Sequence, residues 1–508
     1  MKRLIQIIIF SFLALNVLAQ ENELNIHPDL LIQLDAKKAP FYHGVASGDP
    51  TQSSCIIWTR ITLDAKIKTA SVSWEIAKDS LFKNVIQKGT QVTSEAHDFT
   101  VKVDVQNLKP NVVYYYRFSY NKLKSIVGKT KTLPKDKSDF EIAFASCSNY
   151  EWGYFNNYRS IANNKEIDLV VHLGDYIYEY GIGNYGDTTI GRINVPAHEI
   201  VTLNDYRTRY SLYRLDQDLL KVHQEKPFIT TWDDHESANN SYTEGAENHQ
   251  ENEGNWITRK EAAKKAYYEW LPVRESTEDR LYRSFLIGKL ANLIILDTRL
   301  EGRTEQVTME SEIYEDSTRT ILGKEQFNWL ISNLKKNQVW NIIGNQVPFG
   351  SLNMTGPNGK EKYMDGWEGY PYERSQLVKF LQNQKIDNTV FVTGDFHKAF
   401  ALEIDLDGTK DSSDNVAIEF IVTSITSAND DEYYTVEETQ QMQQMYLENN
   451  PNMLYCNNKD NGYVVVKIKN DKITTDFIYT STVKQPKSAE HIEATFEVLS
   501  GKPVLIKR

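Results

Sequence analysis

Hydrophobic and polar residues alternate in short runs through the first quarter of the chain. Residues 53–61, 70–77, 97–105 and 112–120 are rich in β-branched and aromatic side chains, and turn-forming residues separate these runs. Alternation with a period of two is typical of strands that bury one face. The stretch 108–118 also resembles the tyrosine corner of immunoglobulin-like domains. We therefore predict an immunoglobulin- or fibronectin-like β-sandwich over residues 41–135.

The pattern changes at Phe140, where buried apolar runs begin to alternate with amphipathic segments. Residues 132–140, which carry Lys, Asp and Pro, form the predicted linker. Strand–helix alternation at this spacing predicts a parallel or mixed sheet with helices packed on it. Strands are predicted at 140–146, 167–175, 228–232, 339–346 and 388–397, and helices at 153–164, 325–337 and 374–384.

Polar residues of metal-ligand type stand at the ends of four of these strands. A single strand-end Asp is more often a turn or cap than a ligand, and a single His or Cys more often packs in a core. Four strand ends at one edge of a sheet would gather carboxylates, which is costly unless cations neutralise them. We therefore predict a metal centre. The residues at these strand ends are Cys147, Asp175, Tyr178, Asp233, Asp234, His235, Asn239, Asp395 and His397.

The chemistry of the candidate ligands indicates two kinds of ion. A thiolate from Cys147 and a phenolate from Tyr178 suit a strongly Lewis-acidic centre such as Fe³⁺. The oxygens of Asp234 and Asn239 suit a hard ion such as Ca²⁺. Neighbouring ions would clamp a phosphoryl group for in-line displacement and generate a hydroxide nucleophile. The candidates to bridge the ions are Asp175 and Asp395.

Charge and the N-terminal residues limit the partners and the location. The formal net charge of −12 argues against nucleic acid, because phosphate backbones require a basic surface. Residues 1–19 combine Lys2 and Arg3, an apolar run and a small-residue cleavage site ending at Ala19, which is typical of a secretory signal peptide. Its removal would bring the net charge from −12 to −14. No later apolar run has the length of a membrane span. We interpret Cys55 and Cys456 as buried, unpaired thiols.

Seven motifs resemble those of a known family. They are "HGVASGDPTQSSCIIWTRI", "SCSNYEWGYFNNYRSIA", "LVVHLGDYIYEYG", "LNDYRTRYSLYRLD", "TTWDDHE", "ILDTR" and "TGDFH". They occur in the order seen in PhoD-type alkaline phosphatases, a branch of the calcineurin-like metallophosphoesterases. The resemblance runs from about His43 to Lys467. Each motif alone has modest specificity for the family, but the seven together are a highly specific signature.

The resemblance implies a division of the chain and a set of site residues. It implies a four-layer αββα catalytic domain at 138–485, after a signal peptide (1–19), an extension (20–40) and the sandwich (41–135), and before a C-terminal tail (486–508). It also implies one Fe³⁺ with two Ca²⁺. The implied iron ligands are Cys147, Asp175, Tyr178, Asp395 and His397, and those that face calcium are Asp175, Asp234, Asn239 and Asp395.

Further polar residues have two interpretations each. His235 stands where the wider superfamily places a histidine beside the substrate phosphate, so it would protonate the leaving group or contact the phosphate. Arg299 would clamp phosphate, or form a buried ion pair with Asp297. Remaining candidates either line the site or serve structure, namely Asn345, Gln346, Asp365 and Trp367.

We predict an exported alkaline phosphatase of the periplasm or the extracellular space. It would be a monomer that hydrolyses small phosphomonoesters and diesters by a metal-activated hydroxide, without a phosphoenzyme. An alternative is a phospholipase D-like or other phosphodiesterase on the same metal core. A more remote alternative is a non-catalytic exported binding protein. A helix predicted within 432–449 either gates the site or only packs through Met442, Met445 and Tyr446.

Overall fold

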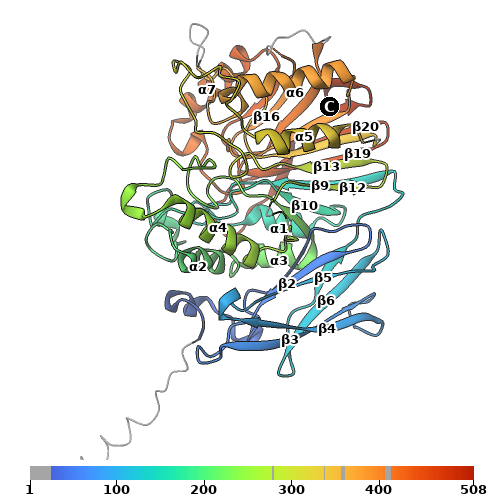
Figure 1. The fold of residues 1–508 in the computed structure, drawn as a ribbon, viewed down its shortest axis with the longest axis vertical. Coiled ribbons are helices and arrows are strands. Elements are labelled where there is room, and N and C mark those ends of the chain that lie inside the picture. Colours follow the sequence, from blue (N-terminus) through green and yellow to red (C-terminus); the bar gives the residue numbers. More distant parts are fainter. Residues whose placement is uncertain (1–23, 277, 279, 337, 356–360, 407–413) are drawn as a thin grey trace, which may run out of the picture.

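The computed structural model describes residues 24–508, except 277, 279, 337, 356–360 and 407–413 (Figure 1). The predicted signal peptide lies outside the described residues. No helix in the described part of the chain is long and apolar enough to cross a membrane. The helices are α1 (Asn156–Asn163), α2 (Leu203–Tyr213), α3 (Gln217–Glu225), α4 (Trp256–Trp270), α5 (Gly323–Leu334), α6 (Pro371–Gln384) and α7 (Val436–Asn449).

A ten-stranded mixed sheet forms the centre of the molecule. Its strands are ordered β22 (Lys502–Lys507), β21 (Glu490–Leu499), β20 (Lys472–Thr480), β19 (Gly462–Lys469), β9 (Asp139–Ala145), β10 (Leu169–His172), β11 (Pro227–Thr230), β1 (Val45–Gly48), β2 (Cys55–Arg60) and β5 (Thr100–Val105). The central strands β9, β10, β11 and β1 are parallel. Ile142 and Phe144 of β9 face one core, and Ala143 and Ala145 face another. Because both faces of β9 are buried, its sequence is a continuous apolar run.

A seven-stranded sheet lies against the ten-stranded one, and helices cover the outer faces of both (Figure 1). Its order is β12 (Arg283–Ile287), β13 (Ala291–Ile295), β14 (Trp340–Asn345), β15 (Thr389–Thr393), β17 (Ala417–Ile421), β16 (Ala399–Ile404) and β18 (Met453–Asn457). Helices α1 to α4 share a core with the ten-stranded sheet, and α5 to α7 share one with the seven-stranded sheet. Tyr446, Met442 and Met445 of α7 pack on that core, so packing alone explains their spacing.

Three strands of the predicted sandwich, β1, β2 and β5, belong to the ten-stranded sheet. A smaller sheet of β4 (Val85–Ser94), β3 (Thr69–Ala77), β6 (Val113–Tyr120), β7 (Leu123–Lys124) and β8 (Gly128–Lys131) packs on β1, β2 and β5. Because β1 pairs with β11, this N-terminal region continues directly into the central sheet. The Tyr114 hydroxyl accepts the backbone N–H of Lys109 at 2.9 Å, as expected for a tyrosine corner. The immunoglobulin-like topology stays a prediction.

The C-terminal residues correct one predicted boundary. We predicted a tail at 486–508, but these residues contain β21 and β22, which extend the ten-stranded sheet at its edge. Ala494, Phe496 and Val498, at alternate positions of β21, lie in the core between the two large sheets, which explains why this segment pairs as a strand. Cys55 and Cys456 are buried free thiols, as predicted.

Candidate active site

The loops at the carboxyl ends of strands in both large sheets meet at one place. Loops after β9, β10 and β11 come from the ten-stranded sheet, and loops after β13, β14, β15 and β17 come from the other. Backbone hydrogen bonds join them: Cys147 N–H donates to Gly174 O at 3.2 Å, and Ile425 N–H donates to Ser146 O at 2.9 Å. Ligand sites of open α/β sheets form at such an edge, so the strand ends singled out from the sequence lie together where a ligand site is expected.

Four candidate ligands have left-handed backbone conformations. The φ angles are 58° at Cys147, 56° at Asp175, 63° at Asp395 and 62° at His397. Non-glycine residues are uncommon in this region, and each such conformation costs about 1–3 kcal/mol unless the surroundings enforce it. Because backbone strain gathers at functional sites, four adjacent cases support a shared function for these turns.

The first group of candidate ligands joins a thiol, a carboxylate and an imidazole. Ligand atoms of Cys147, Asp175 and His397 lie within 4.8 Å of one another. The Cys147 thiol donates to Asp175 Oδ2 at 3.3 Å, and the Tyr178 hydroxyl lies 3.3 Å from both Asp175 Oδ2 and His397 Nε2. Burial, together with the Asp175 carboxylate, raises the pKa of the Cys147 thiol and of the Tyr178 phenol. A cation bound here would oppose that shift, because it stabilises thiolate and phenolate.

The second group consists of Asp175, Asp234 and His235, so it shares Asp175 with the first. The His235 imidazole is fixed by Glu179, whose Oε2 lies 2.7 Å from Nδ1. Burial lowers the pKa of His235, but the carboxylates of Asp234, Glu179 and Asp175 outweigh burial and raise it well above its usual value. With Nδ1 held by Glu179, Nε2 is the ring atom left to exchange a proton with a ligand.

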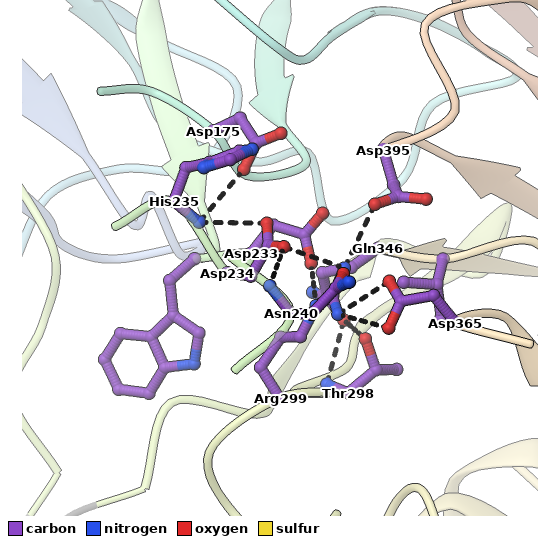
Figure 2. Close-up of polar contacts among 12 residues, drawn as sticks. Asp175, Asp233, Asp234, His235, Asn240, Thr298, Arg299, Gln346, Asp365 and Asp395 are labelled. Atoms are coloured by element: carbon purple, nitrogen blue, oxygen red, sulfur yellow. Dashed lines mark hydrogen bonds and ion pairs between the residues drawn. The ribbon is translucent and has the colours of Figure 1, made fainter. Parts of the chain in front are cut away.

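The third group of carboxylates, Asp233, Asp234 and Asp395, surrounds Arg299 (Figure 2). The guanidinium is fully buried; it donates to Asp233, to Asp395 Oδ1 at 3.0 Å and to Asp365 Oδ1 at 3.0 Å, and it lies 3.6 Å from Asp234. Arg299 is therefore a counter-ion within the cluster, and its donors are directed to carboxylates.

This geometry corrects one interpretation of Arg299 from the sequence. The pairing with Asp297 is wrong, because Asp297 Oδ1 instead accepts the backbone N–H groups of Arg299 and Leu300, each at 2.9 Å. Each of the three guanidinium nitrogens donates to a carboxylate, which favours a counter-ion over a phosphate clamp.

Burial dominates the electrostatics of the acidic cluster. It raises the pKa of Asp175 and Asp233 well above the usual range, and that of Asp395 to about 7. Burial also acts on Asp234, but Arg299 and His235 outweigh it, so the pKa of Asp234 is lowered. Asp233 Oδ2 is buried with no hydrogen-bond partner among the described residues. These carboxylates are costly to ionise together, and bound cations would offset that cost.

Further predicted residues bond to neighbouring protein groups. The side-chain amide of Asn239 lies 3.4 Å from Glu247, and its role as a calcium ligand stays a prediction. The next residue, Asn240, donates its backbone N–H to Asp234 Oδ2 at 2.7 Å. Gln346 serves structure, because it donates to Leu296 O at 2.7 Å and accepts from Thr298 N–H at 3.0 Å. Asn345 also bonds within the protein, because its amide donates to Val347 O and accepts from the Trp367 indole. Asp365 accepts from Arg299.

One buried carboxylate that the sequence analysis missed holds two ligand turns together. Glu236 accepts backbone N–H groups from Asp175 at 3.0 Å, Tyr176 at 2.6 Å and Asp233 at 2.8 Å. It therefore fixes the turn after β10 against the turn after β11. Gly174 permits the same approach, because a Cβ there would lie 2.4 Å from Asp233 Cβ. The only sequence signal for Glu236 is its place at the end of the "TTWDDHE" motif.

Comparison with known proteins agrees with this site. Residues 142–477 match the family of PhoD-like phosphatases, and residues 27–134 match the N-terminal domain of PhoD-like phosphatases. The chain belongs to the PhoD-like phosphatase family. It is 38% identical over 481 residues to alkaline phosphatase D of Bacillus subtilis (strain 168), which covers 90% of this chain and 80% of that protein. A solved structure described as PhoD is 34% identical, with a TM-score of 0.84 and 93% of each chain covered.

These similarities decide two predictions. The family assigned from the seven motifs is confirmed, and so is the assignment to phosphatase enzymes. The remote alternative, a non-catalytic binding protein, does not fit a PhoD-like phosphatase. The residue roles and the identity of the ions stay predictions.

Proposed function

We propose that this PhoD-like phosphatase is an exported, metal-dependent hydrolase of phosphomonoesters and diesters on a four-layer αββα scaffold. The observation that carries the proposal is the sharing of ligands: Asp175 belongs to two candidate metal groups and Asp234 to two. Shared carboxylates hold ions close together, as hydrolytic sites with two metals require. The N-terminal pattern of residues 1–19 supports export.

The donor chemistry supports Fe³⁺ and Ca²⁺ as the ions. Cys147, Tyr178, Asp175 and His397 combine sulfur, phenol, carboxylate and imidazole donors, which suit Fe³⁺. Asp234 adds the oxygen donors that suit Ca²⁺. Ions held here would supply Lewis acidity and activate a water nucleophile near neutral pH. The predicted stoichiometry of one iron and two calcium ions rests on the family resemblance.

The protein's own side chains would position the substrate and move the proton. Glu179 holds Nδ1 of His235, which leaves Nε2 as the ring nitrogen that would donate a proton to the leaving oxygen. Arg299 holds Asp233 and Asp395 in place by ion pairs and would lower the charge of the cluster. His235 is the proposed catalytic acid, and Arg299 is a positioning residue.

A substrate panel tests the proposal directly. Phosphate or alcohol release would be measured from p-nitrophenyl phosphate, bis-p-nitrophenyl phosphate and phosphatidylcholine, before and after chelation. We expect chelator-sensitive release from the first two. If phosphatidylcholine is cleaved faster than the other two esters by orders of magnitude, the phospholipase D-like alternative is favoured over the phosphatase. Product release that survives complete metal removal would contradict metal dependence.

A further inference from the structure

A line of aromatic rings leads from the first ligand group to the surface. The Tyr185 ring is stacked with the His397 ring at 6.4 Å between centroids and 17° between planes, and its hydroxyl lies 3.3 Å from His397 Nδ1. Trp152 meets Tyr185 edge-on at 5.9 Å, and Tyr433 meets Trp152 edge-on at 6.2 Å. Exposure rises outward along the line, because Trp152 and Tyr185 are half-buried and Tyr433 is 59% exposed.

A second ring connects the line to the proposed catalytic acid. The half-buried Tyr180 ring lies 5.4 Å from the His235 ring and 5.5 Å from the Tyr185 ring. Rings therefore extend from both histidines of the site toward solvent. A leaving group that departs on the side of His235 and His397 would pass along these rings.

One lysine fixes the outer rings in place. Lys484 Nζ lies 4.4 Å from the Trp152 ring centroid and donates to Trp152 O at 3.1 Å. It also pairs with Glu432 at 2.9 Å and Asp187 at 3.4 Å. These contacts join four chain segments, so the rings are ordered before any ligand arrives, which reduces the entropy lost on binding.

We propose that Trp152, Tyr180, Tyr185 and Tyr433, together called the aromatic rim, bind the leaving group of the ester by ring stacking. The rim selects phosphoesters whose alcohol carries a flat unsaturated ring, such as an aryl group or a nucleobase, over those with a saturated ring of similar size. Stacking of a flat ring on aromatic side chains contributes about 1–3 kcal/mol in nucleic-acid sites, which corresponds to roughly 5- to 150-fold. This inference rests on the proposed hydrolase function.

Benzyl phosphate and cyclohexylmethyl phosphate form a matched pair for the test. Both release a primary alcohol with a six-membered ring, but only one ring is flat. The quantity measured is the ratio of kcat/KM for the two esters with the metal-loaded enzyme. We expect a ratio of about 10 in the wild type, falling toward one in Tyr433→Ala and Trp152→Leu. Metal content of each variant, measured on the same samples, should equal the wild type.

Tyr434→Ala is the control variant, because Tyr434 is the next residue and is 48% exposed. It should leave the ratio unchanged. A ratio near one in the wild type, or a ratio unaffected by Tyr433→Ala and Trp152→Leu, would contradict leaving-group binding by the aromatic rim. The proposed hydrolase function would still stand. Failure to release phosphate from either ester by metal-loaded wild type would overturn both the rim and the proposed function.

Discussion

Asp175 is the residue on which the proposed metal centre most depends. Its carboxylate belongs to two ligand groups, and its left-handed turn is fixed by Glu236. Asp175→Asn keeps the size of the side chain but removes the shared negative charge. We expect phosphate release to fall by about 100-fold or more, together with a lower metal content. Full activity with full metal content would show that the carboxylate does not bridge ions.

Cys147 tests the nature of the first ion. Cys147→Ala removes the thiol of the first ligand group, and we expect iron and activity to be lost together. Elemental analysis and the visible absorption of purified protein provide the readout, because thiolate or phenolate bound to Fe³⁺ is coloured. Cys55→Ala is the control: this thiol is also fully buried, but it lies on β2 in the core beneath the smaller sheet. Iron retained in Cys147→Ala would make the thiol a bystander.

Arg299 distinguishes a structural counter-ion from a substrate clamp. Removing one partner of a buried, hydrogen-bonded charge cluster costs about 3–5 kcal/mol. Arg299→Met should lower the free energy of unfolding by that amount, measured by urea denaturation of protein with matched metal content. Arg280→Met removes a half-buried partner of the exposed Glu278 and should cost less than about 1 kcal/mol. An unchanged free energy of unfolding together with a raised KM in Arg299→Met would instead support Arg299 as a phosphate clamp.

At the scale of elements, the site depends on how two turns are held together. Glu236 binds backbone N–H groups from both the turn after β10 and the turn after β11. Glu236→Gln replaces one acceptor oxygen by an amide that cannot accept these bonds. We expect metal affinity to fall about 10- to 100-fold, with activity rescued at high metal concentration.

A matched substitution controls for a general loss of stability. Glu373 is likewise a buried carboxylate that accepts backbone N–H groups, those of Ile321 and Leu322, but it lies on α6. Glu373→Gln should lower stability without changing metal affinity, measured by metal titration. Equal metal affinities in Glu236→Gln and the wild type would show that the two turns hold their geometry without this carboxylate.

The sequence predicts those parts of the site whose position depends on the local pattern of apolar and polar residues. Strands such as β10 are buried on both faces, so their apolar runs mark the edge at which Cys147, Asp175 and His397 meet. The partners of Arg299 were not predictable, because its loop approaches Asp233 and Asp395 only after two sheets pack. Pairing across sheets leaves no periodic signal in the chain.

At the scale of the molecule, packing of the two large sheets creates the site. Each sheet alone would expose one wall of the acidic cluster, with Asp175 and Asp234 from one sheet and Asp395 from the other. The core between the sheets therefore sets the distances among the ligand groups. In the same way, β1 couples the N-terminal region to the strand that precedes Asp233.

Metal removal and return, followed on one sample, tests the central claim most directly. Phosphate release from p-nitrophenyl phosphate would be measured together with iron and calcium content before chelation, after it, and after each ion is restored. We predict that activity disappears with the ions and returns with them. Undiminished phosphate release from protein that contains neither ion would contradict a metal centre at these strand ends.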